Sequence, residues 1–217
     1  MLSSPIMTQQ MHVPDPRERE SARRYFQPFI GRFQGCQSVV DIASGQWHFL
    51  EMLKEAGIHA TGVELDAELC ERSRSKGLKV INESFFDHLK AVPPGAYDGA
   101  NVSHIVEHFL PVQVEELFRL LHPALKPGSP MVILTPNIAN MRRAVGDFWR
   151  DPTHVRPYPV SALSKLLRRA GWEVAESGEY TDRKPSLARA VLYGLRNALL
   201  GRYWCGDDLF VVARRRD

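Results

Sequence analysis

Residues 39–53, VVDIASGQWHFLEML, decide the fold of this chain. A short run of β-branched apolar residues leads into the small residues Ala43, Ser44 and Gly45, and helical spacing of apolar residues follows. Small residues let a ligand approach backbone N–H groups, and the N-terminus of a helix favours negative charge. The stretch predicts a strand, a ligand-binding loop and a helix. Taken alone, it fits a tight turn without a ligand equally well.

The same strand-then-helix unit recurs along the chain. Strands are predicted at 38–42, 60–65, 78–82, 97–104, 131–135, 172–177 and 209–214, and helices at 17–33, 49–56, 67–76, 87–92, 111–122 and 161–170. This alternation indicates a doubly wound α/β fold, with seven mostly parallel strands and helices on both faces of the sheet. Only a loop or insertion separates the last two strands, which predicts one antiparallel edge strand.

Composition narrows the class of protein. A chain of 217 residues with 44% hydrophobic and 24% charged residues is typical of one globular domain, assigned here to 17–217 after a flexible arm at 1–16. A net charge of +3 does not indicate a nucleic-acid partner. No signal peptide and no apolar run of about 18–20 residues is present, which predicts a cytoplasmic protein. The oligomeric state is not predicted.

The end of the second strand adds a further sign of a ligand. Glu64 lies at the tip of GVELD (62–66), about twenty residues beyond the small-residue loop. A carboxylate there can accept both hydroxyls of a ribose. The alternative is a surface glutamate that caps the next helix, although Asp66 can serve as that cap. Because the loop lacks GxGxxG and a Walker lysine, a nucleoside-type cofactor is favoured over a dinucleotide or a triphosphate.

Five stretches make the chain resemble a class I S-adenosylmethionine-dependent methyltransferase. They are VVDIASGQWHFLEML (39–53), TGVELD (61–66), SHIVEHF (103–109), LHPALKPGSPMVILTPN (121–137) and DPTHVRPYPVSALSKLLRRAGW (151–172). The last is similar to a subgroup of bacterial methyltransferases found with lipopolysaccharide, O-antigen and other glycan assembly. The resemblance implies a Rossmann-like fold, S-adenosylmethionine as cofactor, and a small-molecule or glycan acceptor.

The resemblance also implies roles for single residues. Asp41 would lie near the methionine amino group, Ala43, Ser44 and Gly45 beside the methionyl and ribose parts, Glu64 at the ribose hydroxyls and Leu65 beside the adenine. At the exit of the third strand, Ser84 stands where the family usually has an acid, and Phe85 follows it. Ala43 and Trp47 each stand at a position where the family usually has glycine. These departures leave a second interpretation open, a non-catalytic cofactor-binding or scaffold protein with a degenerate site.

The segment SHIVEHF would lie over the methyl end of the cofactor. His104 and His108 are candidate bases, since imidazole accepts a proton near neutral pH. Glu107 is assigned to orienting the substrate or to a structural role. A His/Glu pair could also hold a divalent metal, but the sequence identifies no third ligand, so no metal site is assigned.

The segment 138–160 is predicted to cap the pocket, and it offers His154 to the catalytic group. Arg156 and Tyr158 are assigned to the substrate, with Arg156 suited to a carboxylate or phosphate. The alternative is that His154 and Arg156 fasten this loop to the domain. The insertion 181–206 has leucines at helical spacing between arginines, which fits a peripheral membrane contact, a core helix or a dimer contact. The predicted reaction is O-methylation by in-line methyl transfer.

Overall fold

The computed structural model describes residues 16–140, 143–182, 186–200 and 206–216. The arm at 1–16 therefore lies outside the described residues except for Pro16, which begins a helix. The sheet strands are β1 (Val39–Ile42), β2 (Ala60–Glu64), β3 (Lys79–Asn82), β4 (Gly99–Ser103), β5 (Pro130–Pro136), β6 (Trp172–Tyr180) and β7 (Asp208–Arg215). The helices are α1 (Pro16–Ile30), α2 (His48–Glu55), α3 (Ala67–Ser75), α4 (Phe85–Ala91), α5 (Pro111–Ala124), α6 (Val160–Arg169) and α7 (Leu187–Leu200).

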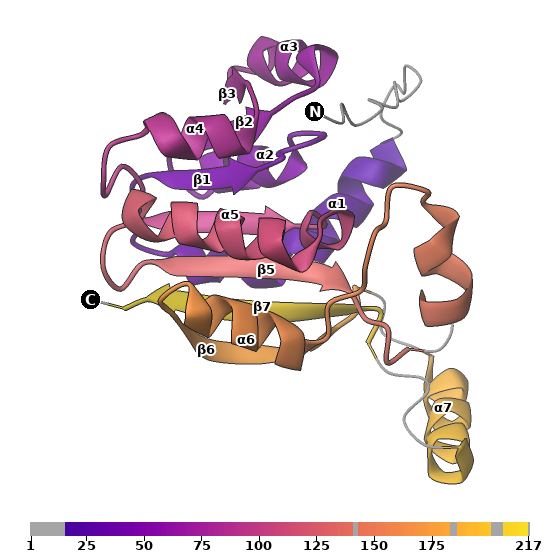
Figure 1. Cartoon of the computed structure of the whole chain (residues 1–217). Helices are drawn as coiled ribbons and strands as arrows, with labels where there is room; N and C mark the ends of the chain where they lie inside the picture. Colours follow the sequence, from indigo (N-terminus) through magenta and orange to yellow (C-terminus); the bar gives the residue numbers. More distant parts are fainter. Residues whose placement is uncertain (1–15, 141–142, 183–185, 201–205, 217) are drawn as a thin grey trace.

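The sheet has the order β3-β2-β1-β4-β5-β7-β6, which confirms the doubly wound α/β class (Figure 1). Neighbours from β3 to β5 pair in parallel, and β7 pairs antiparallel with both β5 and β6. The sequence places the antiparallel strand at the edge, whereas β7 inserts between β5 and the edge strand β6. A single segment after β6 returns along the sheet, and this reversal makes β7 antiparallel to both neighbours.

Two apolar layers hold helices against the two faces of the sheet. One layer joins α4, α5 and α6 to residues such as Val102 and Ile133, and the other joins α1 and α2 to residues such as Val132 and Leu134. All seven residues of β5 are buried, as expected for a strand covered on both faces. Edge strand β6 instead alternates between more buried and exposed residues. Burial of apolar side chains on both faces is the main source of stability for such a sheet.

The ends of the helices follow local sequence rules. The Asp66 carboxylate accepts from the backbone N–H groups of Glu68 and Leu69, so it caps α3. Helix α5 begins with Pro111, whose missing N–H would have no helical partner at that position. These ends set the directions in which the chain leaves the carboxyl edge of the sheet.

The carboxyl edge of the parallel strands carries the irregular segments (Figure 1). The short 3-10 helix η2 (Val106–His108) follows β4, and the predicted cap contains the π-helix η3 (Arg143–Asp147) and the 3-10 helix η4 (Phe148–Arg150). The N-terminal end of α1 also reaches this edge. The insertion predicted at 181–206 contains α7, and its residues 183–185 and 201–205 lie outside the described part. No helix within the described residues is both long and apolar enough to cross a membrane.

Candidate active site

Three backbone positions at the centre of the carboxyl edge are strained. Ala43 and Trp47 follow β1 and His104 follows β4, with φ angles of 52°, 56° and 53°. Within the described chain, they are the only residues other than glycine with positive φ. Such strain gathers at functional sites when the surrounding fold holds it in place. Because β1 and β4 are the strands between which the connection reverses direction, this is where ligands bind in doubly wound folds.

The loop after β1 and the end of β2 form one unit. The Glu64 carboxylate accepts from the N–H groups of Gly45 at 2.8 Å, Leu65 at 2.8 Å and Asp66 at 2.9 Å. A Cβ on Gly62 would lie 2.6 Å from Ser44 Oγ, so only glycine permits this approach of strand and loop. The carboxylate is fixed in place, and of its roughly four lone-pair sites three are taken, which leaves one for a further donor. The ribose-binding role of Glu64 stays a prediction.

Ser44 and Leu65 differ in their accessibility. Ser44 Oγ is buried without a hydrogen-bond partner, and it lies against Gly62 of β2. Beside it, Leu65 is 60% exposed and offers an apolar side chain next to Glu64. The chemistry of these residues fits the ribose and the adenine of S-adenosylmethionine. Ser84 and Phe85 lie at the start of α4, with Ser84 making no side-chain cap and Phe85 buried in the core.

Asp41 is a buried carboxyl group at the end of β1. Asn101 Nδ2 donates to its Oδ1 at 2.7 Å, and Asn101 Oδ1 accepts from Ser103 at 2.9 Å. The pKa of Asp41 is raised to about 7, mainly by burial; the Asn101 hydrogen bond acts in the opposite direction, and the Glu64 charge contributes to the rise. The sequence analysis missed Asn101 as the partner. Its signal was a polar residue in the otherwise apolar strand GANVS.

Trp47 does not occupy the predicted crevice. Its ring is buried in a cluster with Leu50, Cys70, Leu78 and Val80, and Lys76 Nζ lies 5.0 Å from the ring centroid. The side chain therefore packs between α2, α3 and β3, on the far side of the loop. The departure from the family glycine leaves a strained backbone at the start of α2, and it does not obstruct the cofactor loop.

A cavity of about 670 Å³ opens beside the loop, over the ends of β4 and β5. This volume is in the range of small-molecule sites. Its lining includes residues of α1, the cap and the start of β7, together with the three predicted catalytic histidines. The lining residues are Glu18, Ser21, Ala22, Tyr25, Phe26, Gln46, His48, His104, Glu107, His108, Pro136, Asp151, His154 and Asp208. Glu64 and Leu65 do not line this cavity. It therefore lies on the acceptor side of the predicted cofactor site.

Glu107 is the buried centre of the polar groups in this cavity. Its side chain has no exposed area; His104 Nδ1 lies 3.3 Å from Oε1, and Thr135 Oγ1 donates to Oε2 at 3.0 Å. Burial acts to raise the pKa of Glu107, but the hydrogen bond and charge of His104 outweigh it and leave that pKa below the ordinary value. The group is therefore a buried carboxylate.

His104 links Glu107 to a second acid. Its Nε2 lies 2.8 Å from the hydroxyl of Tyr25 on α1. Burial, followed by the charge and hydrogen bond of Asp208, raises the pKa of Tyr25 well above its usual value. Asp208, Tyr25, His104 and Glu107 thus form a connected polar chain from β7 to η2. The sequence analysis missed Tyr25 and Asp208 because they lie 79 and 104 positions away from His104 in the sequence.

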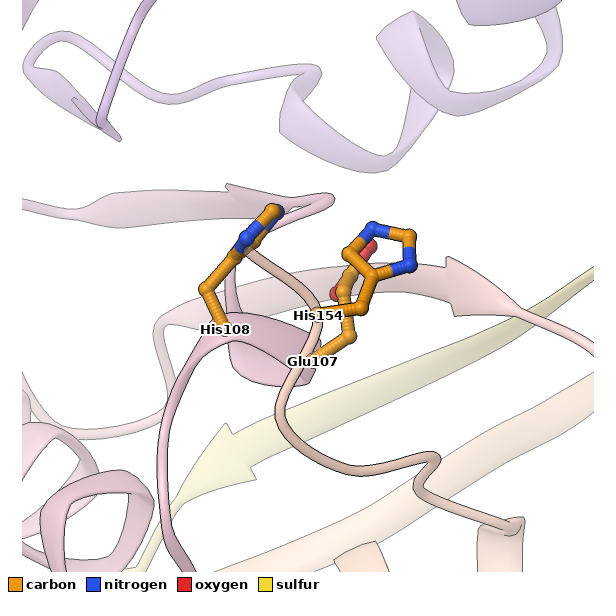
Figure 2. A group of neighbouring side chains, drawn as sticks. All are labelled: Glu107, His108 and His154. Carbon is orange, nitrogen blue, oxygen red and sulfur yellow. The ribbon is translucent and has the colours of Figure 1, made fainter. Parts of the chain in front are cut away.

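The cap loop brings His154 beside Glu107 and His108. Figure 2 shows the two rings and the carboxylate gathered together although they come from two separate segments. The His108 and His154 ring centroids are 4.8 Å apart. The backbone carbonyl of Glu107 accepts from the N–H groups of Val155 at 2.9 Å and Arg156 at 3.1 Å, which fastens the loop to η2.

Hydrogen bonds set the tautomers of both rings. His154 Nδ1 lies 2.7 Å from the carbonyl oxygen of Phe148, which can only accept, so Nδ1 carries the proton. Thr153 Oγ1 donates its single proton to Asp151 at 2.5 Å, so it accepts from His108 Nδ1 at 2.9 Å. Each neutral ring then has a lone pair on Nε2. Burial also lowers the pKa of His108, with the His154 charge acting in the same direction and the Glu107 charge against it.

Of the three residues assigned to the substrate, Glu107 lines the cavity, whereas Arg156 and Tyr158 do not. Tyr158 is buried in the core, where its hydroxyl donates to the carbonyl of Phe109 at 2.7 Å. This placement differs from the prediction, because the ring fills the space beneath the cap and supports it. Arg156 is exposed, and its guanidinium lies 5.7 Å from the Tyr158 ring centroid.

Comparisons with known proteins bear on the family and the fold. A family model described as a methyltransferase domain matches residues 14–177. A SAM-dependent methyltransferase from Archaeoglobus fulgidus is 28% identical with a TM-score of 0.75, over 91% of this chain and 94% of that one. No match is found among curated proteins.

Two further structures share the fold at lower identity. An S-adenosylmethionine-dependent methyltransferase from Mesorhizobium loti is 21% identical with a TM-score of 0.63, over 88% of this chain and 98% of that one. Mitomycin 7-O-methyltransferase is also 21% identical with a TM-score of 0.63, over 93% of this chain and 58% of its own length. The chain belongs to the methyltransferase domain family and is an S-adenosylmethionine-dependent methyltransferase.

Proposed function

We propose that this methyltransferase transfers the methyl group to an oxygen atom of a small molecule or a glycan precursor. The observation that carries the proposal is the group of three imidazoles around the buried Glu107 carboxylate, in the cavity beside the cofactor loop. A hydroxyl acceptor must lose a proton when it is methylated. Imidazole is the side chain suited to accept it near neutral pH.

The cofactor half of the site has the roles expected from the resemblance. Glu64 holds the ribose hydroxyls, Asp41 receives the methionine amino group, and the backbone of 43–45 lies along the ligand between them. Leu65, Ser84 and the backbone of Phe85 complete the adenine end. The fixed Glu64 carboxylate at the end of β2, bonded to the loop through Gly45, supports this assignment.

We assign the role of general base to His108. Its Nδ1 proton is held by Thr153, so Nε2 can accept the proton of the acceptor hydroxyl. S-adenosylmethionine supplies, when bound, a methyl group already activated by its sulfonium. His108 would take the proton of the acceptor hydroxyl as its oxygen bonds to the methyl carbon, and the electron pair of the broken S–C bond would stay on sulfur. Orientation of the two reactants contributes several kcal/mol in well-aligned systems.

The glycan alternative depends on the similarity of 151–172 to the glycan-associated subgroup. Arg156 in that segment is exposed on the cap loop, where its guanidinium can bind a phosphate or carboxylate of a larger acceptor. A sugar phosphate or an acidic sugar would match this charge. Arg156→Ala is expected to raise KM for such an acceptor and to leave KM for a neutral phenol unchanged.

Methyl transfer from isotopically labelled S-adenosylmethionine to matched acceptors tests the proposal. The panel contains a phenol, a catechol, a hexose, a sugar phosphate and an amine, and nuclear magnetic resonance identifies the atom that receives the methyl group. We expect an O-methyl product, with a large loss of rate in His108→Ala and none in His59→Ala, since His59 is exposed at the opposite end of the strands. Transfer to the amine alone would overturn the proposal.

A further inference from the structure

We propose that Glu107, His108 and His154 form a binding site for a divalent transition-metal ion. One potential ligand atom from each residue lies within 4.8 Å of those of the other two. Two imidazoles and one carboxylate are the donor set that suits Zn²⁺, Mn²⁺, Fe²⁺ or Co²⁺ better than Ca²⁺ or Mg²⁺. Figure 2 shows the three side chains grouped on one side of the η2 turn.

The outer hydrogen bonds prepare both histidines as ligands. His154 donates from Nδ1 to Phe148, and His108 donates from Nδ1 to Thr153, so both present a bare Nε2. Neither Nε2 makes a hydrogen bond within the part of the chain that the structure describes. Metal-binding histidines generally donate the other ring N–H to a carbonyl, a carboxylate or a similar acceptor, which fixes the ring orientation. This pattern is found twice here.

Glu107 and its surroundings also suit an ion. The side chain is fully buried, and Thr135 fixes one of its oxygens from β5. Asp151 Oδ2 lies 3.8 Å from His154 Nε2, so a second carboxylate borders the group. Ligand atoms around an ion lie about 3–3.5 Å apart when each is about 2.1 Å from it. Small side-chain rotations from the present positions would give that spacing.

The effect of the ion on catalysis rests on the proposed function. An ion in this position would hold the acceptor hydroxyl and lower its pKa, as bound metals do for water. His108 would then be a ligand instead of the base, and the acceptor proton would leave to solvent. The binding of metal itself does not depend on which atom is methylated.

Calorimetry of the chelator-stripped full chain with ZnCl₂ and with MnCl₂ tests the site, and CoCl₂ adds a visible absorption readout. We expect one ion per chain, with His154→Ala and Glu107→Gln weakening binding by at least about 100-fold and Thr153→Val by about 10-fold. His59→Ala is the matched control and should bind as the wild type does. Thermal unfolding and S-adenosylhomocysteine binding of each variant show whether it is folded.

Each outcome bears on one claim. Absence of binding for all three metals in the wild type would overturn the site, as would equal weakening in His59→Ala. Methyl transfer to oxygen that is unaffected by chelation would overturn the catalytic role of the ion and leave the proposed function intact. Metal binding with transfer only to nitrogen would contradict the proposed function and leave the site standing.

A different observation carries a second inference, at α7. This helix stands clear of the sheet in Figure 1. Leu187, Val191, Leu195 and Leu199 follow each other at four-residue intervals, and each is more than half exposed, with Leu187 at 84%. Residues at this spacing lie on one side of a helix. The helix therefore presents an apolar stripe to its surroundings.

We infer that this stripe docks on an anionic membrane surface. Charge selects this occupant: residues 183–206 contain five basic residues and no acidic one. Arg196 is exposed; at about 100° per residue it lies about 180° around α7 from Leu187 and about 60° from Leu199, so it borders the stripe at the end of the helix. Apolar residues on one side and basic residues on the other are typical of helices that lie in a membrane interface.

Co-sedimentation of the full chain with vesicles tests this inference. We expect binding to phosphatidylglycerol-containing vesicles, weaker binding at high salt, and little binding to pure phosphatidylcholine. Leu187→Gln with Leu195→Gln should abolish it, whereas Val112→Gln, an exposed apolar residue on α5, should not. No binding to the anionic vesicles would overturn the inference. The inference would also be overturned if the wild type were a dimer in analytical ultracentrifugation and the Leu187→Gln, Leu195→Gln variant were a monomer.

Discussion

Asp41 is the buried carboxyl group that we propose receives the methionine amino group of the cofactor. Its pKa in the folded chain is about 7, above the ordinary value of 3.8, because the group is buried. Between about pH 4 and pH 7, Asp41 is therefore protonated in the folded state and ionised in the unfolded state. Stability from this group is complete below about pH 4 and is lost as the pH rises to about 7.

Asp41→Asn is expected to remove this dependence. The amide oxygen can still accept from Asn101, and no charge is buried at high pH. Urea unfolding should show a free energy of unfolding about 2–4 kcal/mol higher for the variant at pH 8, and a similar value for both proteins at pH 4. Equal stability at pH 8 would show that the carboxyl group has an ordinary pKa.

Cofactor binding should have the opposite pH dependence. In the proposed site, the methionine ammonium group would favour the ionised form of Asp41, so binding at low pH would have to expel the proton that the raised pKa holds there. Between pH 7 and 5, the Kd of S-adenosylhomocysteine is expected to rise about tenfold per pH unit. Asp41→Asn should bind more weakly at pH 8 and show a flat profile. A steep profile in the variant would assign the titration to another group.

The turn from β1 into α2 is the element most altered from the family pattern. Trp47 has a φ of 56°, which costs about 1–2 kcal/mol for a residue other than glycine. Its ring is also buried between α2 and α3. Loss of a buried aromatic ring costs about 3–5 kcal/mol, which exceeds the strain. The packing of the ring explains why this position is not glycine.

Trp47→Gly is therefore expected to destabilise the chain by about 2–4 kcal/mol in urea unfolding. Its affinity for S-adenosylhomocysteine should stay within about threefold of the wild type, since a difference of that size is under 1 kcal/mol. Trp149→Gly, at a tryptophan that is 60% exposed, is the matched control and should change stability less. A variant that is both more stable and tighter binding would mean that Trp47 obstructs the crevice.

For the whole molecule, cofactor binding should appear as added stability. A ligand at about 100 times its Kd adds about 2.7 kcal/mol to a folded protein, which raises the Tm of a chain this size by about 5–10 °C. S-adenosylhomocysteine should give such a shift and NAD should give none. A shift with NAD alone would indicate a nicotinamide-dependent protein.

Local sequence was sufficient for the fold and for placing the loop after β1 beside Glu64, whose binding role stays a prediction. Strand 39–42, the small-residue loop and Glu64 are read from adjacent residues, and the structure brings them into one unit. The polar chain through Tyr25 and Asp208 joins segments far apart in the sequence, so periodicity carries no signal of it. His154 was predicted for the pocket, but its place beside Glu107 and His108 depends on how the cap loop docks. Tyr158 shows the converse, because a polar side chain near a site can be part of the core.

The most direct test of the central claim is calorimetry of S-adenosylhomocysteine with the wild type, Glu64→Ala and Glu68→Ala. Glu64 lies at the end of β2, whereas Glu68 is exposed in the first turn of α3. We predict one site in the wild type, binding about 10- to 100-fold weaker in Glu64→Ala, and no change in Glu68→Ala, because a charge-assisted hydrogen bond contributes about 1.5–3 kcal/mol. Absence of binding in the wild type, or equal affinity in all three proteins, would contradict the assignment of the cofactor to the ends of β1 and β2.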